Sequence, residues 1–261
     1  MRLDKFLAES SIGTRKNVRT YIKEGAVKVN GQVITEPAIE INENIDFIEY
    51  LDKVVDYRGK VYYMFHKPAG CITARKDAVN KTVLDFFDDV NMNGIFHVGR
   101  LDKDTEGLLL LTNDGEFEHQ LMCHGKHVEK KYFFVALGSL NEEDIKRLES
   151  GISIGEDGIL TKPAKIEVVK HGTYKEVEKE MDIRKFYNME SNSYNQPVVS
   201  GYLTISEGRK HQVKRMLKAV GCYVVYLKRV SIGSLMLDES LEKGQYRMLK
   251  EEEIQKLLGN L

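Results

Sequence analysis

The sequence lacks several features that would place it in other classes of protein. Its 261 residues carry 39 Lys and Arg against 40 Asp and Glu, so a formal net charge of −1 excludes a histone-like polycation. No apolar run approaches the roughly 18–20 residues of a membrane span. The opening residues, Met1 to Asp4, lead directly into a charged segment and do not resemble a secretory signal. We therefore expect a globular cytoplasmic protein without membrane partners.

Cysteine is scarce, and its spacing excludes two further kinds of site. Cys71, Cys123 and Cys222 are widely separated and odd in number, which indicates a reduced compartment and no disulfide framework. No CxxC pair is present, so the sequence predicts no zinc site. Neither a GxxxxGK(S/T) nor a GxGxxG motif occurs, so we expect neither a metal nor a nucleotide cofactor.

Charge is segregated near the N-terminus. Residues 1–30 hold seven Lys or Arg and three Asp or Glu, whereas residues 31–59 hold two and seven. Apolar spacing predicts one helix over residues 2–10 and a second that Thr14 caps, and Asn30-Gly31 predicts a hairpin between alternating apolar residues. The second helix carries a basic face, formed by Arg15, Lys16 and Arg19. This pattern suits an RNA-docking module, although charge alone equally describes a solvated helix face.

A charged linker over residues 49–60 separates this module from a larger unit over residues 61–261. Strands are predicted at residues 61–65, 95–101, 108–112, 131–137, 164–169, 199–206 and 222–227, with helices at 82–90, 115–123, 141–151 and 213–221. Because strands and helices show little strict alternation, the pattern favours an α+β fold with a mainly antiparallel sheet. The polar residues 171–197 are expected to form a long loop excursion.

The loop from Gly99 to Gly107 is dense in carboxylates and lies between two apolar strand candidates. It includes Asp102 and Asp104, and its glycines allow close backbone approach or a positive φ. A calcium loop would need a bidentate Glu where Asn113 stands, and leucines occupy the preceding positions, so calcium is excluded. A solvated acidic turn remains the plain alternative.

A second informative stretch, residues 207–230, holds seven Lys or Arg and one acid. Lys210, Lys214 and Lys218 follow at intervals of four and form one stripe of a predicted helix, while His211 and Arg215 form the next. Such a stripe repels itself unless anions neutralise it. The pattern therefore favours a polyanionic partner over a solvated face.

Together these segments resemble a known family. Residues 1–48 resemble the S4 RNA-binding domain, through Arg2-Leu3-Asp4-Lys5-Phe6 and Val29-Asn30-Gly31. Residues 61 to about 255 resemble the catalytic domain of the ribosomal RNA pseudouridine synthases, in the branch typified by ribosomal small-subunit pseudouridine synthase A. The matching motifs are Lys67-Pro68-x-Gly70, Gly99-Arg100-Leu101-Asp102-x-x-Thr105-x-Gly107, Lys131-Tyr132, Leu160-Thr161-Lys162-Pro163-Ala164, Glu207-Gly208-Arg209-x-His211-Gln212-Val213-Lys214-Arg215-Met216 and Gly244-Gln245-Tyr246-Arg247.

The resemblance implies a cofactor-free isomerisation of a uridine in RNA, with base flipping. Asp102 would be the catalytic carboxylate, Tyr132 the aromatic that stacks on the target base, and Lys214 the cation that keeps Asp102 ionised, with Arg215 as second choice. Arg100 would enter the space that the base vacates. The loop would be shaped by Gly99, Thr105 and Gly107, and RNA would be held by Arg15, Lys16, Arg19, Lys210, Arg215, Lys218 and Arg229.

The expected substrate is small-subunit ribosomal RNA, free or in a ribosomal subunit assembly intermediate, and the expected state is a monomer. Two alternatives stay open: the same chemistry on large-subunit RNA, or a non-catalytic S4-type ribosome-binding factor on a retired synthase scaffold. Intact Asp102, Tyr132 and Lys214 favour the enzyme.

Overall fold

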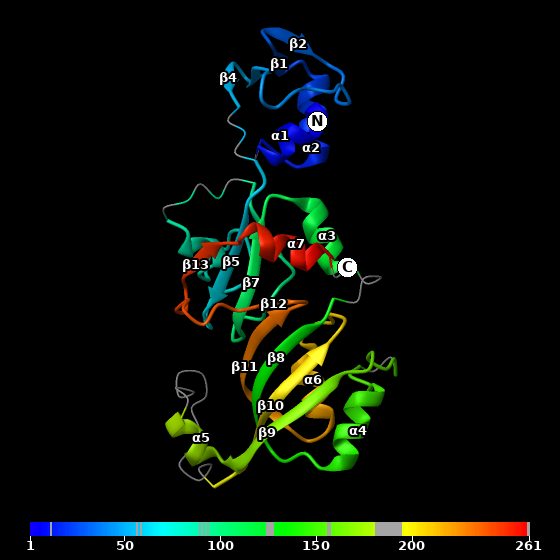
Figure 1. Ribbon diagram of the computed structural model, residues 1–261, viewed down its shortest axis with the longest axis vertical. Helices are drawn as coiled ribbons and strands as arrows, with labels where there is room; N and C mark the ends of the chain where they lie inside the picture. The colour runs from blue at the N-terminus through cyan, green and yellow to red at the C-terminus, as the bar shows by residue number, and fades with distance from the viewer. Residues whose placement is uncertain are drawn as a thin grey trace.

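The computed structural model describes residues 1–10, 12–55, 57, 59–88, 90, 92, 94–123, 128–155, 158–180 and 195–259. Two separate sheets accompany the helices, which confirms the expected α+β class. The N-terminal unit lies at one end of an elongated molecule, and β5 leads from it into the larger unit (Figure 1). No described helix is long and apolar enough to cross a membrane.

The N-terminal unit packs two helices on a small sheet. Its elements are α1 (Leu3–Glu9), α2 (Arg15–Lys23), β1 (Val27–Val29), β2 (Gln32–Ile34), β3 (Ile48–Tyr50) and β4 (Lys53–Val54), with strand order β2-β1-β3-β4. The Thr14 side chain caps α2 by accepting a hydrogen bond from the Asn17 backbone N–H. Positive φ angles at Asn30 (51°) and Gly31 (79°) form the hairpin turn. Both helices and the hairpin occur where the sequence predicted them.

The larger unit is built on a nine-stranded sheet. Its strands are β5 (Tyr62–Lys67), β6 (Phe96–Val98), β7 (Glu106–Thr112), β8 (Lys130–Leu137), β9 (Lys165–Thr173), β10 (Pro197–Ile205), β11 (Tyr223–Ile232), β12 (Leu235–Met236) and β13 (Tyr246–Met248). The order is β13-β5-β7-β11-β8-β10-β9, with β6 beside β7 and β12 beside β11. Among the described strands only β7 and β11 pair in parallel. This pair joins two antiparallel halves (Figure 1).

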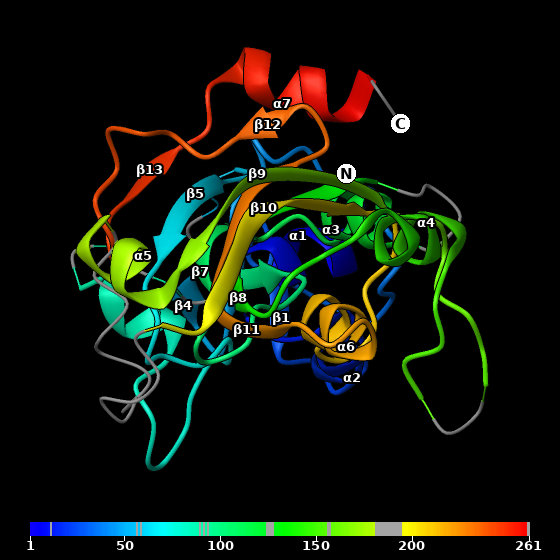
Figure 2. The same cartoon turned by 90° about the horizontal axis from the view of Figure 1, so that it is seen from below.

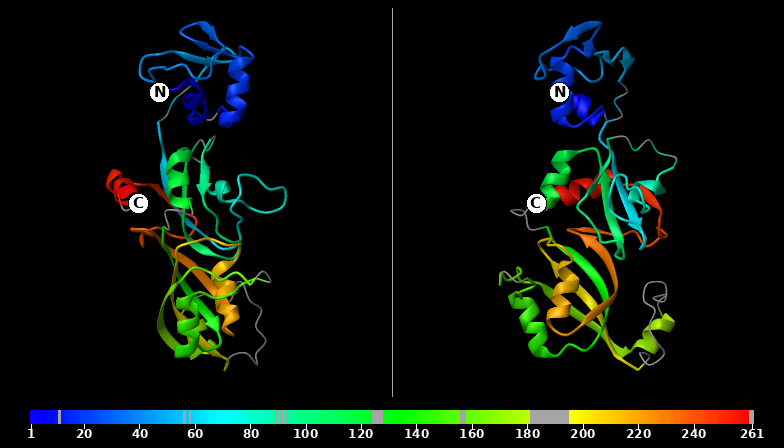
Figure 3. Two further views of the ribbon diagram at one scale, coloured as in Figure 1. Left: turned by 90° about the vertical axis from the view of Figure 1, so that its right-hand side faces the viewer. Right: turned by 180° about the vertical axis from the view of Figure 1, so that it is seen from behind.

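Helices cover the two halves of the sheet. They are η1 (Val83–Phe86), α3 (Gly115–Met122), α4 (Glu142–Ser150), α5 (Tyr174–Glu180), α6 (Gln212–Ala219) and α7 (Glu251–Gly259). α3 and α7 lie with the β5–β7 half, and α4 and α6 with the β8–β10 half (Figures 2 and 3). The apolar face of α6 packs into the larger hydrophobic core through Val213, Met216 and Leu217, all nearly fully buried.

Two segments differ from the sequence predictions. The helix predicted over residues 82–90 is only the short 3₁₀ helix η1 (Val83–Phe86), whose single turn is closed by the Asp85 side chain as it accepts a hydrogen bond from the Thr82 backbone N–H at 2.7 Å. Residues 171–197, expected as one long loop, include the end of β9, which pairs with β10 up to Thr173, and the helix α5. Residues 181–194 of that expected loop lie outside the described part of the chain.

Candidate active site

Asp102 lies in the loop between β6 and β7, and a buried lysine holds the backbone of this loop. The fully buried Lys67, at the end of β5, donates from Nζ to the carbonyl oxygens of Asp102 (3.0 Å), Thr105 (2.9 Å) and Pro68 (3.0 Å). Burial lowers the pKa of Lys67, while the nearby Cys71, Asp104 and Asp102 act in the opposite direction. The ammonium group thus replaces the hydrogen bonds that loop carbonyls otherwise make to water.

Neighbouring contacts fix the loop from its other side. Thr73 Oγ1 donates to the Leu101 carbonyl (2.7 Å) and accepts from the Leu101 N–H (3.1 Å). The Gly70 N–H donates to the Lys103 carbonyl at 2.7 Å. The residues on both sides of Asp102 are therefore held by the segment that follows the Lys67-Pro68 turn.

The surrounding atoms leave no room for a side chain at two glycines of the loop. Gly107 has φ +105°, and a Cβ there would lie 2.2 Å from the Arg229 carbonyl oxygen, so only glycine lets β11 approach β7. Gly99 has φ +66°, and its Cβ would meet the Met122 side chain. Thr105 is buried, and its N–H donates to the Asp102 carbonyl at 3.1 Å. These positions agree with the predicted loop-shaping roles, which remain predictions.

The basic side chains that face Asp102 come from the start of α6. A buried network forms the turn before this helix: Gln212 Nε2 donates to Glu207 Oε1 (2.8 Å), and the Arg209 N–H donates to Gln212 Oε1 (2.8 Å). His211 follows in the left-handed region, with φ 53°. This conformation is uncommon for a side chain other than glycine, and it points to a functional constraint.

Lys214 lies between two carboxylates. Its Nζ is 3.7 Å from Asp102 Oδ2 and makes a short hydrogen bond to Asp104 Oδ1. His211 Nε2 lies 3.5 Å from Asp102 Oδ1. The Asp102 side chain is 31% exposed, so the carboxylate is open to a ligand while a cation stays close to it. A carboxylate in this setting can act as nucleophile or base.

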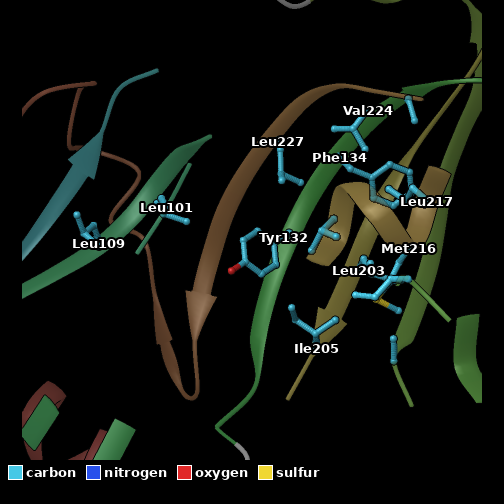
Figure 4. Packing of buried hydrophobic residues seen from close by; sticks show 14 of the residues in the cluster. Leu101, Leu109, Tyr132, Phe134, Leu203, Ile205, Met216, Leu217, Val224 and Leu227 are labelled. Atoms are coloured by element: carbon cyan, nitrogen blue, oxygen red, sulfur yellow. The ribbon is translucent and has the colours of Figure 1, made fainter. Parts of the chain in front are cut away.

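Tyr132 lies in β8 and is 9% exposed. It belongs to the core cluster that includes Leu101, the residue before Asp102. In Figure 4 its hydroxyl end points away from Leu203 and Met216, toward the side on which Leu101 lies. The structure thus places the predicted stacking aromatic close to the loop that holds Asp102.

The predicted RNA-binding residues separate into exposed and buried groups. Exposed side chains are Arg100, Lys210, Arg215 and Lys218 in the larger unit and Arg15 and Lys16 on α2. Arg19 is half-exposed and forms an ion pair with the buried Asp4 at 2.8 Å. Arg229, also predicted to bind RNA, is 2% exposed, and its Nε donates to the Leu108 carbonyl at 2.8 Å. Consecutive residues of β11 alternate between faces, so Arg229 points into the sheet's core.

Sequence reasoning missed three residues of this site. Lys67 was noted only as part of a turn, Asp104 only as part of an acidic loop, and His211 only as a neighbour of the basic stripe. For His211 and Lys67 the signal was present in the motifs that contain them, but their contacts depend on distant segments. Among the described residues, no three His, Cys, Asp or Glu side chains are grouped to hold a metal ion.

Comparisons with known proteins agree with this geometry. The model of the RNA pseudouridylate synthase family matches residues 61–219, and the S4 domain model matches residues 1–44. A solved pseudouridylate synthase is 36% identical, with a TM-score of 0.63, and the match covers 98% of this chain and 99% of that one.

Relatives in bacteria match over nearly the full length. An uncharacterised RNA pseudouridine synthase of Bacillus subtilis is 42% identical, covering 97% of each chain. The ribosomal small subunit pseudouridine synthase A of Haemophilus influenzae is 37% identical, covering 99% of this chain and all of the relative. Its namesake in Escherichia coli is 33% identical, covering 97% of this chain and 98% of the relative.

Proposed function

Because the chain belongs to the RNA pseudouridylate synthase family, we propose that it converts one uridine of small-subunit ribosomal RNA to pseudouridine, with Asp102 as the catalytic carboxylate. The observation that carries the proposal is the partly exposed Asp102 with Lys214 at 3.7 Å. The small-subunit substrate is proposed because full-length relatives bear that name.

The reaction needs no co-reactant because it is an isomerisation. The N1–C1′ bond of the uridine breaks, the uracil turns in place, and a C5–C1′ bond forms. The proton on C5 is lost to solvent, and N1 takes up a proton, so atoms and charge balance. Asp102 attacks the nucleotide or deprotonates it, and both roles require an ionised carboxylate close to the sugar.

The other residues of the site support this step. Lys214 stabilises the Asp102 carboxylate, and Tyr132 stacks on the uracil after it has left the helix. Arg100 is exposed in the same loop as Asp102, where it can occupy the gap left in the RNA stack. A flipped base held by an aromatic ring stays close to the carboxylate while it turns.

The N-terminal unit and α6 supply binding to the RNA backbone. We propose residues 1–48 as the S4-like RNA-binding domain, residues 49–60 as the linker and residues 61–261 as the catalytic domain. Phosphate contacts from Arg15, Lys16, Arg19, Lys210, Arg215 and Lys218 set the position of the RNA without reading its sequence. The proposed setting is the cytoplasm, and the proposed partner is ribosomal RNA or a subunit assembly intermediate, bound by a monomer.

Pseudouridine mapping tests the proposal. Small- and large-subunit RNA from a strain that lacks the protein is treated with wild-type protein, with Asp102→Asn, or with Asp77→Asn as an exposed carboxylate control. Carbodiimide-dependent primer extension should stop at one small-subunit site with wild type and the control only. A stop in large-subunit RNA would correct the substrate. No stop on either RNA, as transcript or particle, would favour the non-catalytic binder.

A further inference from the structure

Two buried cations flank Tyr132 and have no part in the isomerisation described above. Lys130 begins β8 and is 6% exposed, and Arg229 lies in β11 and is 2% exposed. β8 and β11 are neighbours, and Arg229 is in register with Tyr132. Since alternate residues of a strand share a face, Lys130 and Tyr132 point to the same side of the sheet. Both cations therefore lie next to the aromatic of the site.

The described side chains do not neutralise this pair. Arg229 uses Nε for the Leu108 carbonyl, but its Nη2 is buried without a hydrogen-bond partner. Among the described residues, no carboxylate pairs with Lys130. Burial and the Arg229 guanidinium lower the pKa of Lys130 to about 8, and no acidic group opposes them. Each cation makes the charge of the other harder to bury.

In the same protein, the buried cation Lys67 has its hydrogen-bond partners within the chain. Its ammonium group is surrounded by the backbone carbonyls of Pro68, Asp102 and Thr105. Lys130 and Arg229 lack such a shell, although they are buried to a similar degree. Buried charge without a partner is costly, so residues of this kind indicate a ligand of opposite charge.

We propose that Lys130 and Arg229 form a binding site for a phosphate group that flanks the target uridine. The inference rests on the proposed function, because RNA supplies the phosphate. A guanidinium presents paired N–H groups that suit phosphate oxygens, and a neighbouring ammonium adds a second charge. Lys130 is two residues from Tyr132 on β8, about 7 Å along the strand, which is within reach of the phosphate of a nucleotide whose uracil stacks on Tyr132. Phosphate binding then holds the sugar still while the base turns.

The test compares Lys130→Met with Lys131→Met, a matched control in the same strand. Lys131 lies on the opposite face, over the Tyr202 ring and 3.4 Å from Glu167. Binding of uridine, uridine 3′-monophosphate and uridine 5′-monophosphate is measured by calorimetry, alongside thermal unfolding. Tritium release from small-subunit RNA labelled at uridine C5 reports turnover.

Wild type and Lys131→Met should bind one of the two monophosphates about tenfold or more tightly than uridine, as charge-assisted hydrogen bonds allow. Lys130→Met should lose this preference and turn over more slowly, yet unfold at a higher temperature, since a buried charge is gone. If Lys130 had only a structural role, its replacement by Met would not raise stability and at the same time remove the preference for a monophosphate. Arg229→Lys, which keeps a charge but loses the paired N–H groups, should reduce the preference partly.

An unchanged monophosphate preference in Lys130→Met would overturn the site, as would the absence of any preference in wild type. Failure of the proposed function can be distinguished from failure of the phosphate site. If wild type made no pseudouridine in any ribosomal RNA, the nucleotide binding comparison would still decide whether the two cations bind phosphate.

Discussion

Positive charge is arranged differently in the N-terminal unit and in the catalytic unit. On α2, Arg15 and Lys16 are exposed to solvent. In the larger unit, Lys67, Lys130 and Arg229 are buried; Lys67 and Arg229 donate to backbone carbonyls, and the Arg229 charge opposes that of Lys130. The same residue types thus occupy two electrostatic environments in one chain.

Exposed and buried cations contribute differently to an RNA-binding protein. Exposed cations are screened by salt and contribute mainly affinity for a polyanion. Buried cations are screened little by salt, and they hold the backbone around them in place or bind a specific anion. Substitutions on α2 and on the exposed face of α6 should therefore change RNA binding with salt, whereas substitutions around the loop should change turnover or folding.

The largest effect should come from Lys214→Met. Loss of the cation beside Asp102 removes electrostatic support from the reacting group, so kcat should fall by about 10²-fold. RNA affinity measured by filter binding should change little. If kcat stayed within a factor of about three, Lys214 would belong with the exposed binding cations instead.

Lys67→Met should damage folding as well as turnover. It leaves buried carbonyls without partners, so the free energy of unfolding should fall by about 2–4 kcal/mol in urea titrations. The exposed Lys81→Met serves as control. Equal stability of the two variants would show that the loop keeps its shape without the buried ammonium.

The lowered pKa of Lys130 predicts how the stability of the fold changes with pH. The folded value of about 8 lies below the usual 10.5, so the folded protein releases the proton first as pH rises. The free-energy cost of burying the charged lysine is full below pH 8 and disappears as the pH approaches 10.5. Lys130→Met should thus be more stable than wild type at pH 7, and the difference should shrink between pH 8 and 10.5 in chemical denaturation. A constant difference would contradict a buried, titrating lysine.

Asp104→Asn should have a moderate effect, because the Asp104–Lys214 pair is partly exposed. Without its second carboxylate, Lys214 is less well positioned, and kcat should fall about two- to fivefold. Asp104→Glu should restore part of the loss. In a Lys214→Met background the substitution should have no further effect; an additive loss would show that Asp104 acts independently of Lys214.

The smallest effect on turnover should come from Lys210→Ala combined with Lys218→Ala. Both side chains are exposed, Lys210 in the turn before α6 and Lys218 near the end of this helix. RNA binding should weaken, and the slope of log affinity against log salt should become shallower by about one to two. Lys146→Ala on the exposed face of α4 is the control. An unchanged slope would remove both residues from the RNA-binding surface.

Local features were predictable because their causes lie within a few residues. The Thr14 cap, the Asn30-Gly31 turn and the apolar face of α6 depend on side chains close in sequence. The helix predicted over residues 82–90 is shorter in the structure, and helix α5 was missed, because the polar side chains of those segments have partners that the sequence does not reveal.

The candidate site divides in the same way. Asp102 in a glycine-bounded loop and a basic helix with Lys214 could be predicted from the sequence, because their motifs have local spacing. Tertiary packing is the reason that Lys67 binds the loop carbonyls, that Lys214 lies between two carboxylates, and that Arg229 is buried. Those contacts join residues 35 to more than 100 positions apart, and burial depends on which strands pair. Charge can be read from a sequence, but whether water or protein surrounds it is set by packing.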